Sequence, residues 1–186
     1  MALTPSNMLD LQTEAPAFEL PDVISGNVIS LKDISSGKQG TIVMFICNHC
    51  PYVKHVQSEL VRLANDYKDH DIGCVAISSN DIEGYPEDAP GYMLEEARKW
   101  KYPFPYLFDE TQEVAQSYKA ACTPDFYLFD GQLKLVYRGQ LDGSRPGNNV
   151  PLTGESLRKA LDSIIAGIPI DENQIPSMGC NIKWKE

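Results

Sequence analysis

Residues 44–55 read MFICNHCPYVKH and place two cysteines, Cys47 and Cys50, three positions apart at the end of an apolar run. A proline and a series of helix-compatible residues follow the second cysteine. Two cysteines at this spacing can exchange electrons, ligate a metal or fill space in a core. The motif alone does not separate these roles, so the neighbouring sequence has to supply the structural context.

The sequence on both sides of the motif predicts a strand–helix–strand unit. Residues 40–47 form a continuous apolar, β-branched run, which is typical of a strand buried on both faces. From Val53 onward, apolar residues recur at three- and four-residue steps, so we expect a helix with one apolar face through about Lys68. A second apolar run at 71–79 then predicts a parallel strand reached by a right-handed crossover.

The rest of the chain completes the sheet. The further elements expected are two short strands in 15–33 around a turn at 25–27, a loop at 80–92, helices at 93–100, 113–118 and 155–166, a strand at 106–108, and a hairpin with strands 126–130 and 133–139 joined at the turn Asp130-Gly131. This order predicts an α/β fold with a mixed central sheet flanked by helices, an N-terminal strand pair and a C-terminal tail.

Length and composition are those of one soluble domain. The chain has 186 residues, of which 42% are hydrophobic and 23% charged. We expect a single domain with its core at about 15–166 and a C-terminal extension at 167–186, because no repeat, low-complexity tract or linker interrupts the chain.

Charge and segment patterns exclude several classes of partner. A formal net charge of −10 would repel phosphate backbones and anionic lipid surfaces, so we expect neither nucleic acid nor a membrane as partner. No apolar run is long enough to span a bilayer, and the first twenty residues lack the pattern of a signal peptide. The expectation is a cytoplasmic protein, in which a pair of cysteines three apart indicates redox or metal chemistry.

The predicted topology brings a second cysteine-containing segment to the dithiol. Cys47 closes a parallel strand next to a helix N-terminus, where unpaired N–H groups and the helix dipole favour a thiolate. The segment ACTPDF, residues 121–126, precedes a strand that we expect to run antiparallel to the first one. Cys122 should therefore lie near the dithiol. Cys74, inside an apolar strand, is interpreted as a core residue, and the role of Cys180 in the tail stays open.

The motifs CNHCP and CTP, in these settings, resemble the thioredoxin superfamily over about residues 15–166. The APAFEL opening is similar to the peroxiredoxin branch, which includes alkyl hydroperoxide reductases and thiol-specific antioxidant proteins. The sequence looks most like peroxiredoxin-like thioredoxin-domain proteins, which carry NHCP, TPDF.LFD and a GC.IKWK ending. The resemblance implies a thioredoxin-like fold and a thiol–disulfide oxidoreductase.

The resemblance also assigns roles to residues. Cys47 matches the attacking cysteine of thioredoxins, Cys50 the resolving cysteine, and Pro124 the cis-proline that packs against the disulfide. Redox tuning or substrate binding is expected of Asn48, His49, Cys122, Thr123 and Pro124. No organic cofactor is implied. The implied partners are a protein or small-molecule disulfide as substrate and an electron donor of the thioredoxin or glutathione type.

Two alternatives remain beside this interpretation. A peroxidase with an antioxidant function is one, because the peroxidatic cysteine of peroxiredoxins aligns with Cys50. However, Cys47 takes the place of their active-site threonine and Pro124 falls near their arginine, so the donors that polarise peroxide are missing. The other is a non-catalytic module binding zinc or copper(I), with ligands drawn from Cys47, Cys50, Cys122 and His49.

Overall fold

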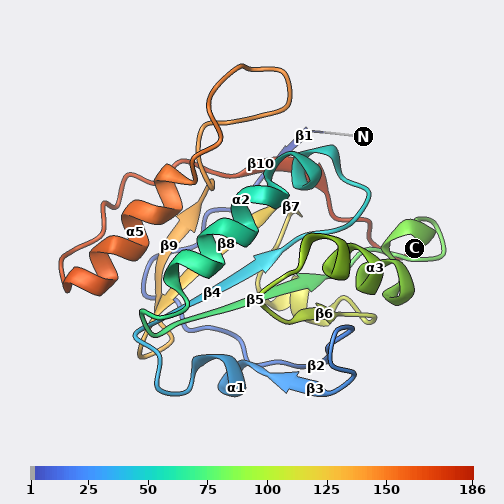
Figure 1. Cartoon of the computed structure of the whole chain (residues 1–186), viewed down its shortest axis with the longest axis horizontal. Helices are drawn as coiled ribbons and strands as arrows, with labels where there is room; N and C mark the ends of the chain where they lie inside the picture. The colour runs from blue at the N-terminus through green and yellow to red at the C-terminus, as the bar shows by residue number, and fades with distance from the viewer. Residues whose placement is uncertain (1–2) are drawn as a thin grey trace.

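Five strands form the central sheet of the computed structural model, which describes residues 3–186 (Figure 1). In spatial order they are β6 (Tyr106–Phe108), β5 (Ile72–Ser78), β4 (Gly40–Phe45), β8 (Asp125–Asp130) and β9 (Leu135–Gly139). Strands β4, β5 and β6 run parallel, whereas β8 and β9 run antiparallel to their neighbours. The mixed sheet predicted from the sequence is confirmed.

Helices cover both faces of this sheet. Along β4, alternate side chains point to opposite faces, so Met44 contributes to one buried cluster and Phe45 to the other. The helices of the Met44 side are α2 (Pro51–Tyr67), α3 (Pro90–Trp100) and α5 (Glu155–Ala166). The helices of the Phe45 side are α1 (Leu31–Ser35) and α4 (Glu113–Ser117). The apolar stripe predicted for α2 faces the sheet, since its apolar positions are buried.

The N-terminal strand pair is present, and two short elements were not expected. The pair consists of β2 (Glu19–Pro21) and β3 (Val28–Ser30), which run antiparallel. Helix α1 follows β3 directly, with Ser30 as its N-cap in a capping box. The loop after β5 contains a short 3₁₀ helix, η1 (Pro86–Asp88), and α3 begins at Pro90 rather than at residue 93.

The C-terminal tail contains a strand that the sequence pattern did not predict. Strand β10 (Met178–Asn181) lies between β1 (Leu3–Pro5) and β7 (Cys122–Thr123) in a separate three-stranded antiparallel sheet. Figure 1 places this sheet beside the N-terminal end of α2, and β10 packs against that helix. The extension is thus part of the architecture around the dithiol.

The hairpin between β8 and β9 differs in its turn. Two residues, Asp130-Gly131, were predicted as the link. Instead the N–H of Leu133 donates to the carbonyl of Asp130, and Leu133 has a φ of 58°. The Asp130 carboxylate accepts the N–H groups of Gln132 and Lys134, which stabilises this longer turn. Within residues 3–186, no helix is both long and apolar enough to cross a membrane.

Candidate dithiol site

Cys47 and Cys50 lie in the turn that leads from β4 into α2. The first residue of the helix is Pro51, whose fixed φ suits that position, and Cys50 is the N-cap. Cys50 makes no side-chain capping hydrogen bond, but the nearby main-chain N–H of Val53 helps to lower the pKa of its thiol. Both cysteines are buried, with 2% of Cys47 and 0% of Cys50 exposed.

Thr123 touches both sulfurs. Its hydroxyl lies 3.3 Å from the Sγ of Cys47, and its carbonyl oxygen lies 3.2 Å from the Sγ of Cys50. The two cysteine side chains also act on each other's pKa. The Thr123–Pro124 peptide bond is cis. These contacts bring together four residues that the sequence had marked as a site.

The pKa values of the two thiols are shifted in opposite directions. A hydrogen bond from Cys47 lowers the pKa of Cys50 to about 5, against the opposing effect of burial, with further donors from Cys180 and Val53. Burial raises the pKa of Cys47 well above its ordinary value, and the Asp88 carboxylate adds to this. When Cys50 ionises, it loses the hydrogen bond that its thiol donates to the Thr123 carbonyl. The interactions with Cys47, Cys180 and Val53 that favour the thiolate remain. These directions favour a negative charge on Cys50, whereas the sequence predicts the attacking thiolate on Cys47, and which sulfur attacks stays a prediction.

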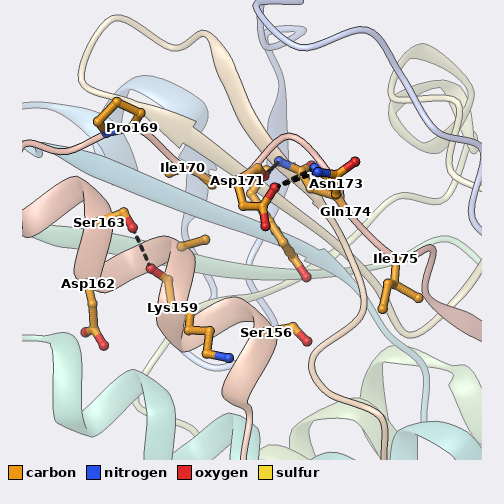
Figure 2. Close-up of a pocket in the computed structure, with 12 residues that line it drawn as sticks. Ser156, Lys159, Asp162, Ser163, Pro169, Ile170, Asp171, Asn173, Gln174 and Ile175 are labelled. Carbon is orange, nitrogen blue, oxygen red and sulfur yellow. Dashed lines mark hydrogen bonds between the residues drawn. The ribbon is translucent and has the colours of Figure 1, made fainter.

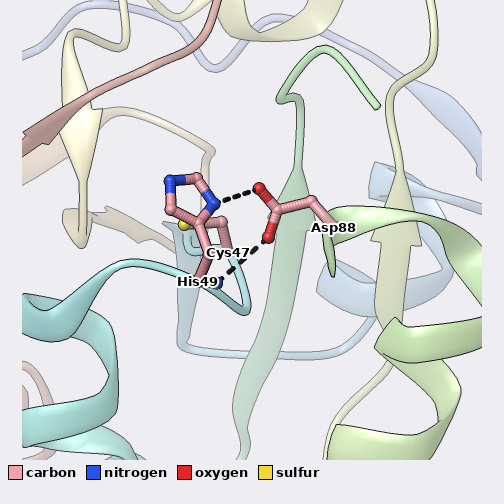
Figure 3. A group of neighbouring side chains, drawn as sticks. All are labelled: Cys47, His49 and Asp88. Atoms are coloured by element: carbon pink, nitrogen blue, oxygen red, sulfur yellow. Dashed lines mark hydrogen bonds and ion pairs between the residues drawn. The ribbon is translucent and has the colours of Figure 1, made fainter. Parts of the chain in front are cut away.

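His49 and Asp88 are hydrogen-bonded beside Cys47 (Figure 3). The Nδ1 of His49 lies 2.6 Å from the Oδ2 of Asp88, and the His49 ring stacks on Tyr85 with 5.0 Å between ring centroids. Asp88 also accepts from the main-chain N–H of Asn48 and of His49, at 2.7 and 3.2 Å, and from the Asn80 amide at 2.8 Å. Despite burial, the bonds from His49 and Asn80 keep the pKa of Asp88 below its ordinary value.

Asn48 supports the turn rather than facing the sulfurs. Its side-chain amide donates to the carbonyl of Glu87 at 2.8 Å, and its oxygen accepts from the hydroxyl of Tyr106 at 3.1 Å. Asp88 and Tyr106 are the residues that sequence reasoning missed. Asp88 lies in the loop predicted at 80–92, but nothing in the sequence of this loop distinguishes Asp88 from the other acids.

The remaining cysteines occupy different positions. The Cys122 thiol points to the carbonyl of Pro124, 3.6 Å away, because successive side chains of a strand face opposite ways and Thr123 faces the dithiol. Cys180 is buried in the same cluster as Cys50, and its thiol and main-chain amide help to lower the pKa of Cys50. Cys74 packs at the margin of the core, as interpreted from the sequence.

The predicted metal-ligand set is not assembled as such. Of the described residues, Cys47, His49 and Asp88 form one group whose ligand atoms all lie within 4.8 Å of one another. A carboxylate has about four lone-pair sites, and Asp88 already accepts from four donors. A metal would have to break at least one of these bonds, so this group is better suited to positioning His49 than to ligation.

A pocket of about 430 Å³ lies elsewhere, between α5 and the segment 169–175. Figure 2 shows Lys159, Asp171 and Gln174 among its lining residues. None of its lining residues belongs to the dithiol site. The pocket therefore plays no part in the chemistry of the cysteines.

The comparisons with known proteins define the class of this protein. The AhpC/TSA family model matches residues 11–138, and the chain belongs to this family. No curated protein matches the chain.

Solved structures extend the comparison. A crystal structure of an uncharacterized conserved protein from Geobacillus kaustophilus has 60% sequence identity and a TM-score of 0.97, covering 100% of this chain and 97% of that chain. A hypothetical protein from Sinorhizobium meliloti 1021 has 43% identity and a TM-score of 0.95, covering 98% of each chain. The thioredoxin domain of a thiol-disulfide oxidoreductase from Bacteroides vulgatus has 22% identity and a TM-score of 0.57, covering 74% of this chain and 91% of that chain. The last similarity shows the thioredoxin-like fold.

Proposed function

We propose that this protein is a thiol–disulfide oxidoreductase whose working pair is Cys47 and Cys50. The observation that carries the proposal is the pair of cysteines at a strand-to-helix junction, with the Sγ of Cys47 against the hydroxyl of Thr123 and the Sγ of Cys50 against its carbonyl. One sulfur is poised as a thiolate and the other as its proton donor, which is the arrangement that thiol–disulfide exchange requires.

In the proposed reaction, the Cys50 thiolate attacks one sulfur of a substrate disulfide. The substrate's other sulfur leaves as a thiolate and takes up a proton, so that a mixed disulfide on Cys50 remains. Cys47 then loses its proton, attacks the Sγ of Cys50 and releases the second substrate thiol. The products are a reduced substrate and a Cys47–Cys50 disulfide. This assignment reverses the roles expected from the thioredoxin motif, because the donors surround Cys50.

His49 and Asp88 serve as positioning residues in this scheme. Asp88 holds the imidazole through Nδ1 and fixes the turn through the N–H groups of Asn48 and His49. The Nε2 of His49 is buried, with no hydrogen-bond partner among the described residues. That nitrogen can exchange a proton with a sulfur that enters or leaves beside Cys47.

The proposed substrates are protein or small-molecule disulfides, and the proposed electron donor is of the thioredoxin or glutathione type. The Bacteroides vulgatus neighbour is a domain of a thiol-disulfide oxidoreductase, and this similarity supports the same class of reaction here. A cytoplasmic location is proposed as well, because an odd number of cysteines in an acidic chain fits a reducing compartment better than a disulfide scaffold.

Disulfide trapping tests the proposal. Wild-type protein treated with a peptide disulfide and then alkylated should show the Cys47–Cys50 disulfide by peptide mapping. A Cys47→Ser variant should still form a mixed disulfide on Cys50 but no Cys47–Cys50 disulfide, and a Cys50→Ser variant should lose exchange. Cys74→Ser is the matched control and should behave as wild type. Exchange that survives in Cys50→Ser at the wild-type rate would refute the role of Cys50.

Peroxide reduction is a second candidate, favoured by membership of the AhpC/TSA family and by the lowered pKa of Cys50. Against it, Pro124 falls near the position of the peroxiredoxin arginine, so that donor is missing. The buried Arg138 does not replace it, because its guanidinium is held by Asp125 at 3.1 Å and by the Lys119 carbonyl at 3.0 Å. We therefore expect slow peroxide consumption in a stopped-flow assay. A rate constant comparable to that of dedicated peroxiredoxins would make peroxidase the main activity.

A further inference from the structure

The tail strand β10 is fixed over the dithiol. Cys180 pairs with Thr123, and Asn181 pairs with Cys122, in an antiparallel register. The approach at Gly179 is so close that a Cβ there would lie 2.0 Å from the carbonyl oxygen of Thr123. That same carbonyl contacts the Sγ of Cys50. The strand is thus seated on the main chain that forms one side of the site.

Hydrogen bonds at both ends keep the strand in this place. On one side, the Ser177 hydroxyl donates to the carbonyl of Pro124 at 2.7 Å. On the other side, the N–H of Lys183 donates to the side chain of Asn80 at 2.8 Å, and Asn80 donates in turn to Asp88. Cys180 is 3% exposed between these anchors.

The position of β10 places a third sulfur, that of Cys180, near Cys50. Cys50 and Cys180 belong to the same buried cluster, and both the side chain and the main-chain amide of Cys180 act to lower the pKa of Cys50. Cys50 therefore has two thiol neighbours, Cys47 from its own turn and Cys180 from the tail. A disulfide needs two Cα atoms within about 4.4–6.8 Å. Both cysteines lie against Thr123, Cys50 through its sulfur and Cys180 through strand pairing, which places them near each other.

We propose that Cys180 is a second resolving cysteine, which forms a Cys50–Cys180 disulfide in competition with Cys47. The proposal rests on the proposed function, since it concerns the fate of the mixed disulfide on Cys50. In the step, the Cys180 thiol loses its proton and its sulfur attacks the Sγ of Cys50. The Cys50–substrate bond breaks, and the substrate leaves as a thiolate that takes up the proton. No further oxidant is consumed, because the bond formed replaces the bond broken.

Formation of the mixed disulfide also removes a negative charge that raises the pKa of Cys180. In the resting dithiol, burial and then the neighbouring Cys50 raise the pKa of Cys180 to about 12. Once Cys50 is bonded to a substrate sulfur, it no longer carries a negative charge. Lys183, whose charge favours the Cys180 thiolate, remains close by. The attacking form of Cys180 thus becomes more accessible at the stage where it is needed.

Oxidised glutathione is the probe for the test. It is added to the full-length variants Cys47→Ser and Cys47→Ser/Cys180→Ser, and the adduct on Cys50 is followed by intact mass and peptide mapping. In Cys47→Ser, the adduct should be lost as a Cys50–Cys180 disulfide forms. Removal of Cys180 should lengthen the adduct's lifetime by about tenfold or more, because a sulfur held in contact has a high effective concentration. Cys47→Ser/Cys74→Ser is the matched control and should behave as Cys47→Ser.

Equal adduct lifetimes with and without Cys180 would overturn the proposal. Mapping of oxidised wild-type protein gives a second measurement that does not depend on the folding of a variant: a Cys50–Cys180 linked peptide supports the proposal, and a Cys47–Cys50 peptide alone refutes it. The proposed function fails separately, if Cys50 takes up no glutathione in Cys47→Ser or if wild type forms neither disulfide.

Discussion

Gly179 lies against the carbonyl of Thr123 so closely that no larger residue fits between the tail and the dithiol site. A Cβ at this position would meet the oxygen at 2.0 Å and the carbonyl carbon at 2.6 Å. Main-chain atoms on a paired strand cannot move aside as a flexible side chain does. The glycine therefore sets how near Cys180 comes to Cys50.

Gly179→Ala should displace β10 and uncover the site. We expect a loss of about 1–3 kcal/mol in the free energy of unfolding, which is typical of overpacking. Alkylation of Cys180 by iodoacetamide under native conditions should become faster, as measured by mass spectrometry. Gly91→Ala is the control, since a Cβ at Gly91 meets nothing within 4 Å. Unchanged alkylation in Gly179→Ala would show that the strand tolerates the methyl group in place.

The ion pair of Asp125 and Arg138 supports the strand that follows Pro124. Both side chains are fully buried, with 3.1 Å between Oδ2 and Nη2, and the guanidinium lies 4.3 Å from the ring centroid of Tyr127. Asp125→Asn should destabilise the protein by about 3–5 kcal/mol, because it leaves a buried guanidinium without its counter-charge. Chemical denaturation measures this change.

A double variant separates the charge effect from a general loss of packing. Asp125→Leu/Arg138→Met removes both charges and should recover much of the stability lost in Asp125→Asn, since apolar replacements of a buried pair are often neutral. If the double variant is less stable than the single one, the two residues contribute mainly through their packing and not through their charges.

The acidity of Cys50 predicts a pH dependence. Ultraviolet absorbance of the thiolate should rise with a midpoint near pH 5 in the reduced protein, because the folded-state pKa of Cys50 is about 5. This pKa is below the ordinary value of 9.0, so ionisation stabilises the folded reduced protein. That stabilisation is complete above pH 9.0 and is lost as the pH falls through about 5.

Two variants test the assignment of this transition. Cys50→Ser should abolish the rise near pH 5. Cys47→Ala should move it upward, because the largest stabilising contribution to the Cys50 thiolate is the hydrogen bond from Cys47, and alanine has no donor. A transition that persists in Cys50→Ser and disappears in Cys47→Ala would place the thiolate on Cys47, as the thioredoxin motif implies.

The strand–helix–strand unit could be predicted from the sequence because its signals are local. The apolar run before Cys47 and the periodicity after Val53 each report on one element. The signal for the N-cap was also present, since Pro51 favours the first helical position and so marks Cys50 as the cap. Because the helix begins at Pro51, the N–H of Val53 acts on the pKa of Cys50 and not on that of Cys47.

Other parts of the site depend on contacts between distant segments. The residues of β10 form a strand because they pair with Thr123 and Cys122, more than fifty positions earlier. The hydrophobic pattern of these residues alone does not predict a strand. Asp88 is selected in the same way, by the N–H groups and side chains that converge on it from the Cys47 turn and from Asn80. The sequence therefore predicts which segments lie near the dithiol, but the particular residues that form the site depend on contacts between distant segments.

The charges beside Cys47 predict opposite shifts of the redox potential. The Asp88 carboxylate disfavours a negative charge on Cys47, and the His49 ring lies on the same carboxylate. Asp88→Asn removes a negative charge beside the reduced dithiol, whose Cys50 thiolate interacts with Cys47, and should raise the potential. His49→Gln removes the coulombic effect of His49 on the Asp88 carboxylate and should lower the potential. A tenfold change in the equilibrium constant corresponds to about 30 mV, and we expect shifts of about this size from a wild-type value between about −270 and −120 mV.

Equilibration against glutathione at several ratios, followed by alkylation, measures these potentials. Glu83→Gln is the control, because it removes an exposed acid from the same loop and should leave the potential unchanged. In the double variant Asp88→Asn/His49→Gln, the two shifts should largely cancel if they act through one pair of charges. Shifts of the same sign in both single variants would mean that the pair acts by holding the turn in place, since either substitution would then loosen the same hydrogen bonds around Asn48 and His49.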